Sequence, residues 1–273
     1  MTEAHPVAGE PQGAATGDAR RVPPCLVVLS PGTLQRARGG SSEAAIAALE
    51  RAAAAAISGG VRALIVREPS LEDGAFLELA LRLRARLDDV RGEGLSERGW
   101  LGVHDRLHLA GTAGADAVHL GGTSLAVGPA RSVVGSSLAI GASSHLGDTG
   151  DTFAGADYLL HAPVFEPTSK SGHGRVTLGW SGAADFAAST DVPVLALGGV
   201  TAEHLTEAEP GSLAALHGVA LIGGLWGTGP ESIDGTSRSL ADLGGISRRA
   251  TDLVAACARH FSVPVAEVGE AHD

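Results

Sequence analysis

Short apolar runs alternate with longer stretches rich in Ala and Leu along most of this 273-residue chain. The runs have the length of buried strands, and the stretches between them have the length of helices. Parallel strands are joined by crossovers that are usually helical, so the alternation indicates a parallel sheet built from βα units. Eight strands are predicted, over residues 25–29, 61–66, 100–103, 117–120, 138–141, 158–160, 194–197 and 219–222.

The first βα unit has clear boundary signals. Ser41 and Ser42 supply hydroxyl groups that cap free amides at a helix start, and Gly59 with Gly60 ends the helix before the next strand. Eight such units favour a closed (β/α)8 TIM barrel, an α/β fold, as a single domain. The alternative is an open doubly wound sheet, which is disfavoured because no Gly-x-Gly-x-x-Gly turn opens the first helix.

The two ends of the chain differ from the barrel pattern. Residues 1–24 are rich in Gly, Ala and Pro, and they are predicted to form a flexible tail, not a signal peptide. The barrel is assigned to residues 25–242. Residues 243–273 are assigned to a C-terminal helical extension with a packing role, because apolar residues recur there at helical spacing.

Composition excludes several classes of function. Asp and Glu number 31 against 20 Lys and Arg, and a net charge of −11 disfavours binding to nucleic acid or anionic membranes. No apolar run is long enough to span a bilayer. Cys25 and Cys257 match neither a disulfide framework nor a zinc site, which suits a reducing compartment. We therefore expect a cytoplasmic protein that acts on small molecules.

Polar residues follow most of the predicted strands, where they share the mouth of a barrel and where active sites of this fold lie. They are Arg67, Glu68, His104, Asp105, Arg106, His119, Ser143, His145 and His161. Four histidines are thus predicted to converge.

The histidines allow two interpretations. With Asp105 they would bind a metal ion, although no Glu stands where a His-Glu-x-x-His site needs it. Alternatively, one imidazole acts as an acid and base near neutral pH. Any single one, such as His119 or His161, can instead fill a polar gap.

Two glycine pairs suggest phosphate binding. Gly198-Gly199 follows the seventh strand and Gly223-Gly224 follows the eighth, the positions that commonly hold phosphate in such barrels. Glycines expose backbone amides that cradle an anion. Lys170 adds a cation in the loop 163–172, which is long enough to be a lid.

Several motifs together point to a family. They are Val66-Arg67-Glu68, His104-Asp105-Arg106, residues 114–121, residues 141–145, Asp157-Tyr158, Pro163-Val164-Phe165 and residues 197–200. Over residues 25–226 they resemble the thiamine phosphate synthase and TenI-type thiazole tautomerase superfamily. The resemblance implies a (β/α)8 barrel that handles thiazole phosphates in thiamine biosynthesis.

The synthase of this superfamily joins a pyrimidine diphosphate to a thiazole phosphate and needs magnesium. Its pattern has Gln and Lys around the strand-two Arg, where this chain has Ile65 and Pro69. It has Asn where this chain has His104, and a second metal-binding Asp where this chain has Ser124, so that Asp105 alone survives.

The strand-six loop departs as well. Pro167 and Ser169 stand where the pattern has threonines, although Lys170 is kept. The tautomerase branch needs no metal, and its Val-Phe-Glu turn is matched by residues 164–166. The likeness therefore implies a tautomerase that works without a cofactor.

In that reading His145 occupies the position of the catalytic histidine and moves a proton, which makes the thiazole aromatic. Arg67 pairs with the substrate carboxylate, unless Glu68 or Asp105 holds it in an internal ion pair. The remaining substrate-binding residues are His104, Ser143, Ser169 and Lys170, and the phosphate-binding residues are Gly198, Gly199, Ile222 and Gly223.

Three alternatives stay open. A divergent synthase would use Mg2+ at Asp105. A non-catalytic protein would bind thiazole or thiamine phosphates without turnover. A metal-dependent lyase or hydrolase would use the histidines. In each case the expected partner is a small-molecule phosphate, with no nucleic acid and no membrane, and a homodimer is compatible with the sequence.

Overall fold

The computed structural model describes residues 22–34, 42–89, 99–166, 176–227 and 238–261. Within them, eight parallel strands pair in chain order, and β8 pairs with β1 to close the barrel. The predicted (β/α)8 barrel is confirmed. The strands are β1 (Leu26–Leu29), β2 (Ala63–Val66), β3 (Trp100–His104), β4 (Ala117–Leu120), β5 (Ala139–His145), β6 (Tyr158–Ala162), β7 (Val194–Leu197) and β8 (Gly218–Leu221).

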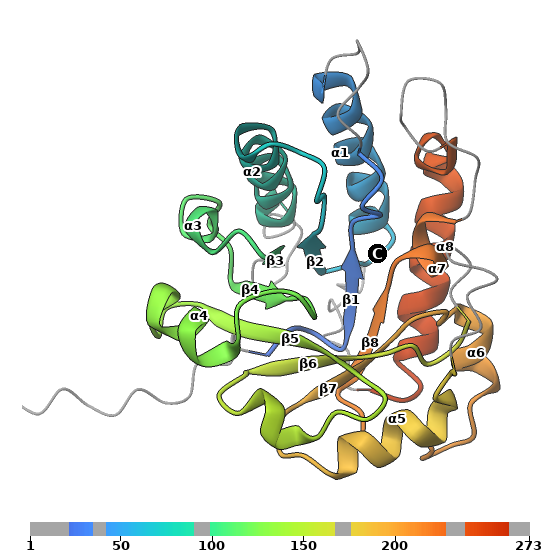
Figure 1. Cartoon of the computed structure of the whole chain (residues 1–273). Helices are drawn as coiled ribbons and strands as arrows, with labels where there is room; N and C mark the ends of the chain where they lie inside the picture. Colours follow the sequence, from blue (N-terminus) through green and yellow to red (C-terminus); the bar gives the residue numbers. More distant parts are fainter. Residues whose placement is uncertain (1–21, 35–41, 90–98, 167–175, 228–237, 262–273) are drawn as a thin grey trace, which may run out of the picture.

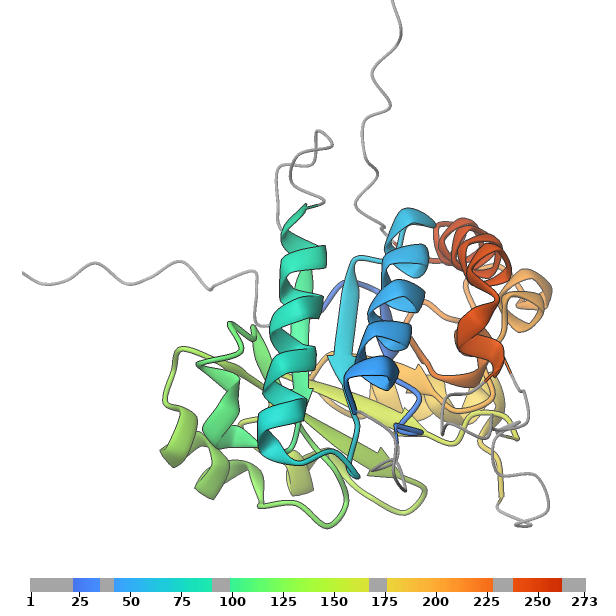
Figure 2. The same ribbon diagram turned by 90° about the horizontal axis from the view of Figure 1, so that it is seen from above.

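The helices surround the barrel and differ greatly in length (Figure 1). The longest, α1, α2 and α8, stand side by side along one flank, with α1 in the middle (Figure 2). On the other flank the coverage is thinner, because a short 3-10 helix, η2, takes the place of an α-helix between β5 and β6. The bounds are α1 (Ser42–Ser58), α2 (Asp73–Asp89), α3 (Leu107–Ala110), α4 (Val127–Val134), η2 (Gly150–Phe153), α5 (Gly179–Ala188), α6 (Ala202–Glu207), α7 (Gly223–Trp226), η4 (Arg238–Ala241) and α8 (Leu243–Cys257).

Alternate residues of each strand point into the barrel and out toward the helices, as the strand period of two requires. The interior contains two aromatic rings among aliphatic side chains, Trp100 and Tyr158, whose centroids lie 5.8 Å apart in an edge-on arrangement. Gly141 makes room for one of them, since a Cβ at this position would lie 2.0 Å from Cζ of Tyr158. Large and small residues thus alternate around the interior.

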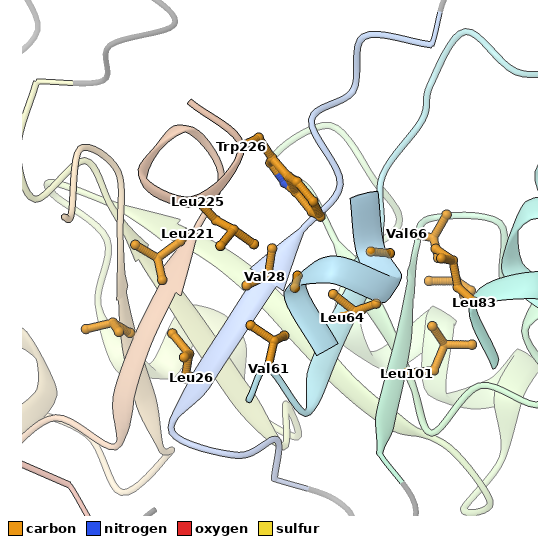
Figure 3. Close-up of a cluster of buried hydrophobic side chains, with 14 of the residues drawn as sticks. Leu26, Val28, Val61, Leu64, Val66, Leu83, Leu101, Leu221, Leu225 and Trp226 are labelled. Atoms are coloured by element: carbon orange, nitrogen blue, oxygen red, sulfur yellow. The ribbon is translucent and has the colours of Figure 1, made fainter. Parts of the chain in front are cut away.

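Outward-facing aliphatic residues form the larger core between strands and helices (Figure 3). Val28 of β1 and Leu221 of β8 pack near Trp226 of α7 in this layer. The Trp226 indole N–H donates to the carbonyl of Leu29 at 2.7 Å, so the short α7 is tied directly to the first strand. This contact positions the second glycine pair, which begins α7.

α8 closes the ring of helices beside α1. A Cβ at Gly59, just after α1, would lie 2.4 Å from the carbonyl oxygen of Ser247 and 2.6 Å from Cβ of Ala250, so the two helices approach very closely there. The helix assigned to a C-terminal extension thus occupies the position of the eighth barrel helix. None of the described helices is long and apolar enough to cross a membrane.

Candidate active site

The carboxyl ends of the strands surround a cavity of about 830 Å³. Most of the predicted site residues line it, and these are Arg67, His104, Ser143, His145, Gly198, Gly199, Ile222 and Gly223. His119 also lines it. Ser169 and Lys170 lie outside the described residues. The structure thus places these residues around one cavity, while their roles stay predictions.

His161 does not reach this cavity, so the expected convergence of four histidines is wrong. Its Nδ1 lies 2.9 Å from Oγ of Ser144, and its ring stacks on Phe186 with centroids 3.8 Å apart. Burial, and then the charge of His145, lowers the pKa of His161 to about 4. Counting along β5 and β6 explains the error: Ser143 and His145 point inward, and Ser144 and His161 point toward the helices.

Arg67 extends from the end of β2 into the cavity. In the described part of the chain its guanidinium forms no salt bridge, and it lies against Gly32, where a Cβ would be 2.5 Å from Nη1. The neighbouring Glu68 has another task. Its two carboxylate oxygens accept the N–H groups of Gly32 and Leu34, each at 2.9 Å. Glu68 therefore holds the loop after β1, and no internal ion pair with Arg67 is seen among these residues.

Burial raises the pKa of Glu68, although the backbone amides of Leu34 and Gly32, the hydroxyl of Ser30 and the charge of Arg67 favour its charged form. A carboxylate buried this deeply costs free energy unless hydrogen bonds compensate for lost water. The two amide donors supply that compensation, and they hold the loop that forms one wall of the cavity.

His104 and Asp105 form a hydrogen-bonded pair at the end of β3. His104 Nδ1 lies 3.0 Å from Oδ2 of Asp105, and the hydroxyl of Ser124 donates to the other carboxylate oxygen. Ser124 in turn accepts the N–H of Gly121 at 2.7 Å. Burial lowers the pKa of His104, the positive charge of Arg67 adds to this effect, and Asp105 opposes it. The neutral ring donates through Nδ1 to Asp105, which leaves Nε2 as an acceptor.

His119 lies deeper than the other two mouth histidines. It is 1% exposed, and its Nε2 lies 2.9 Å from Oγ of Ser143. Burial, and then the charges of His104 and Arg67, lowers its pKa well below the usual value, so the ring is neutral. It stacks on Tyr158 at a centroid distance of 5.7 Å. His119 thus forms the floor of the cavity and orients the Ser143 hydroxyl above it.

His145 is the last residue of β5, and its side chain is exposed at the cavity edge. Its backbone N–H donates to Oδ2 of Asp148 at 2.7 Å, which fixes the turn that follows. A Cβ at Gly122 would lie 3.9 Å from Cε1 of His145. The imidazole therefore borders the cavity and stays accessible to a bound molecule.

The two glycine loops touch each other. A Cβ at Gly224 would lie 2.4 Å from the carbonyl oxygen of Val200, so the loops after β7 and β8 approach without a side chain between them. Within the described ranges, the N–H groups of Gly199, Gly223 and Gly224 donate to no other group. These amides are available for an anion where both loops line the cavity.

The first glycine pair also has a packing role. Gly198 and Gly199 have φ values of +96° and +67°, which side chains rarely tolerate. A Cβ at Gly199 would lie 2.6 Å from the backbone of Phe165, whose N–H donates to the carbonyl of Gly198 at 2.9 Å. Glycine is therefore required here by the backbone, whether or not phosphate binds.

The residues at the mouth do not fit a magnesium ion. Magnesium prefers carboxylate oxygens and retained water. Asp105 is the carboxylate beside His104, it is not among the residues that line the cavity, and each of its oxygens accepts a hydrogen bond, one from His104 and one from Ser124. Across the described ranges, no group of three or more His, Cys, Asp or Glu side chains is arranged to hold a metal ion.

The closed parallel barrel and the cavity at the carboxyl ends of its strands define the class of protein: a (β/α)8 barrel with its site at the usual mouth. The chain belongs to the thiamine monophosphate synthase (TMP-TENI) family, whose sequence profile matches residues 40–225. The predicted superfamily is confirmed, and with it membership of an enzyme family of thiamine biosynthesis.

Relatives carry the name of the synthase. The chain is 38% identical over 173 residues to a putative thiamine-phosphate synthase of Geobacter sulfurreducens, covering 61% of this chain and 74% of that protein. It is 32% identical over 189 residues to a thiamine-phosphate synthase of Methanoculleus marisnigri, covering 68% and 83%. These names favour the alternative reading of the sequence, not the tautomerase.

A solved structure has the same fold. The thiamine phosphate pyrophosphorylase from Pyrococcus furiosus matches with a TM-score of 0.62 and 20% identity, over 88% of this chain and 96% of that chain. At this identity the likeness concerns the fold alone.

Proposed function

We propose that this protein is a metal-independent tautomerase of a thiazole carboxylate phosphate. The observation that supports the proposal is which side chains at the mouth of the barrel face the cavity and which are hydrogen-bonded within the protein. Arg67 and His145 face the cavity, whereas Asp105 is bound to His104 and Ser124 where a cation would need its oxygens. Such a site suits proton movement within a bound anion better than release of a diphosphate.

Binding of the substrate would use both ends of the cavity. The amides of Gly199, Gly223 and Gly224 would hold the phosphate, because they have no other acceptor within the described ranges. Arg67 would pair with the carboxylate, since neither Glu68 nor Asp105 engages its guanidinium. Two anionic groups held at separate points fix the orientation of the ring between them.

His145 would then move the proton. An imidazole accepts and returns a proton readily near neutral pH. In the reaction one C–H bond of the substrate breaks, its proton passes to the imidazole, and a proton returns to another carbon of the same conjugated system. No other reactant is consumed, and aromatisation of the ring supplies the driving force. The hydroxyl of Ser143, oriented by His119, would lie beside the reacting ring.

The test is a set of variants assayed on the thiazole carboxylate phosphate tautomer. His145→Ala is expected to lower kcat by about two orders of magnitude or more, the usual contribution of a positioned acid and base. His108→Ala is the matched control, because that histidine lies exposed on α3 next to Asp73, outside the cavity lining. Tautomerisation at the parental rate by His145→Ala would exclude this mechanism.

The second candidate is a Mg2+-dependent synthase, which the names of the relatives favour. One preparation assayed for both reactions separates the two. Coupling of hydroxymethylpyrimidine diphosphate to thiazole phosphate only when Mg2+ is present would establish the synthase. Binding of the thiazole phosphate with neither reaction would establish a non-catalytic binder. In all three cases the proposed partner is a small-molecule thiazole phosphate.

A further inference from the structure

His104 and Ser124 are both hydrogen-bonded to Asp105 and form a cluster with it at the rim of the barrel. Both oxygens of the Asp105 carboxylate accept a hydrogen bond inside this cluster, from Nδ1 of His104 and from the hydroxyl of Ser124. Ser124 is itself fixed by the N–H of Gly121. The cluster therefore fixes Asp105 through two donors that belong to the protein.

The backbone turns Asp105 away from the cavity. Asp105 has φ +57° and the next residue, Arg106, has φ +36°, a conformation that residues other than glycine rarely adopt. His104 lines the cavity, whereas Asp105 and Ser124 are not among its lining residues. Arg106 holds this arrangement from behind, because its Nη1 donates to Asp73 and its Nη2 to the carbonyl of Leu71, each at 2.5 Å.

The imidazole of His104 occupies the space between this carboxylate and the cavity. A Cβ at Gly121 would lie 3.1 Å from Cε1 and 3.3 Å from Nε2 of His104, so the ring packs directly against the turn after β4. Arg67 also lines the cavity. Burial lowers the pKa of His104, Asp105 opposes this shift, and the positive charge of Arg67 adds to it. A divalent cation here would be repelled by the guanidinium of Arg67, and it would have to compete with the two hydrogen-bond donors bound to Asp105.

We propose that the His104–Asp105–Ser124 cluster excludes a divalent cation from the mouth and thereby selects monophosphates over metal-bound diphosphates. His104 and Ser124 act as specificity-determining residues, since they bind the carboxylate that a cation would need. This inference adds to the proposed function the class of phosphate that the cavity accepts. It rests on the proposed function, because it assumes that the cavity binds a phosphorylated substrate. Its test needs no thiazole substrate, so the two can fail separately.

The experiment is a titration of the full chain with Mn2+, followed by electron paramagnetic resonance of the free ion. The wild type is expected to show no saturable site and to match Asp105→Asn. The double variant His104→Asn/Ser124→Asp replaces the imidazole by a shorter amide, whose oxygen can also act as a ligand, and replaces the hydroxyl donor by a second carboxylate. It is expected to show a saturable Mn2+ site, at least about tenfold tighter than any residual binding by the wild type, because the number of carboxylates governs affinity for such ions.

Ser132→Asp is the matched control, since it adds the same charge at an exposed position of α4. A saturable Mn2+ site in the wild type that Asp105→Asn abolishes would overturn the proposal. So would a double variant that folds, by circular dichroism, yet binds Mn2+ no more tightly than Ser132→Asp. If the double variant does not fold, the proposal is tested by comparing Mn2+ binding to the wild type with Mn2+ binding to Asp105→Asn.

A second measurement tests the selection of phosphates directly. Calorimetry with inorganic pyrophosphate is expected to show that Mg2+ strengthens binding to the double variant but not to the wild type, for which complexation of pyrophosphate by Mg2+ in solution weakens the apparent affinity. Inorganic phosphate serves as the reference ligand for both proteins. A tenfold or greater gain in pyrophosphate affinity when Mg2+ is added to the wild type would refute the exclusion of the cation.

Discussion

Protonation of His161 is expected to destabilise the fold between neutral and moderately acidic pH. The ring is 2% exposed, it stacks on Phe186 and lies 2.9 Å from Oγ of Ser144, and its pKa is lowered to about 4. An unfolded histidine has a pKa of about 6.5, so the unfolded chain binds a proton at a higher pH than the folded chain does. The contribution of His161 is therefore fully present above the unfolded pKa and is lost as pH falls through the folded pKa.

The size of the effect follows from the two pKa values. Between pH 7.5 and pH 5 the free energy of unfolding should fall by about 2 kcal/mol on account of His161 alone, from linkage between a pKa of about 6.5 unfolded and about 4 folded. Other groups also titrate in this range, so the quantity to measure is a difference between proteins.

Urea unfolding of wild type and His161→Gln at several pH values between 7.5 and 5 gives that difference. The free energy of unfolding of the variant should fall less steeply, by about 2 kcal/mol over the range. His161→Asn, a second side chain that does not titrate, should give the same change in slope even if its stability at pH 7.5 differs. Parallel pH profiles for the wild type and both variants would contradict a lowered pKa of His161, because they would show that the buried ring binds no additional proton on unfolding.

Three further predictions concern the interior and the mouth. Gly141→Ala should lower the free energy of unfolding in urea by about 1–3 kcal/mol, because the added Cβ would lie 2.0 Å from Tyr158. The control Gly128→Ala, which has open space around it on α4, should be neutral or stabilising. Equal effects of the two substitutions would contradict this packing. Tyr158→Phe should leave stability unchanged or raise it, since the buried hydroxyl has no partner among the described residues, and a loss above about 1 kcal/mol would indicate a hidden partner. Arg67→Met should raise KM for the carboxylated substrate by about tenfold or more, as expected for a charged hydrogen bond, and an unchanged KM would exclude pairing with the carboxylate.

The local pattern of the sequence was enough to predict the barrel. Each strand is a short apolar run bounded by turn residues, and the predicted positions agree with the observed strands to within a few residues. Gly59 and Gly60 end the first helix region as expected, although Gly59 also permits the contact with α8. These strand and helix boundaries depend on residues that are neighbours in the sequence, so they can be predicted before the tertiary structure is known.

The directions of the mouth residues were predicted less well. The fifth and sixth strands run further than expected, to His145 and Ala162, and this extension decides which alternate residues face the cavity. Counting by two from Tyr158 would have sent His161 outward, but only if the strand was known to continue that far.

Periodicity and motifs are local properties of the chain, and they were sufficient to predict a closed barrel of eight units, the family and the residue types at the mouth of the barrel. The tertiary structure alone decided their partners. Glu68 binds amides of the loop after β1, and Asp105 binds His104 and Ser124, although the sequence left open whether either carboxylate pairs with Arg67. Those choices depend on groups that lie far apart in the chain and meet only when the barrel closes. They leave Arg67 open to a ligand and the carboxylate of Asp105 bound within the protein.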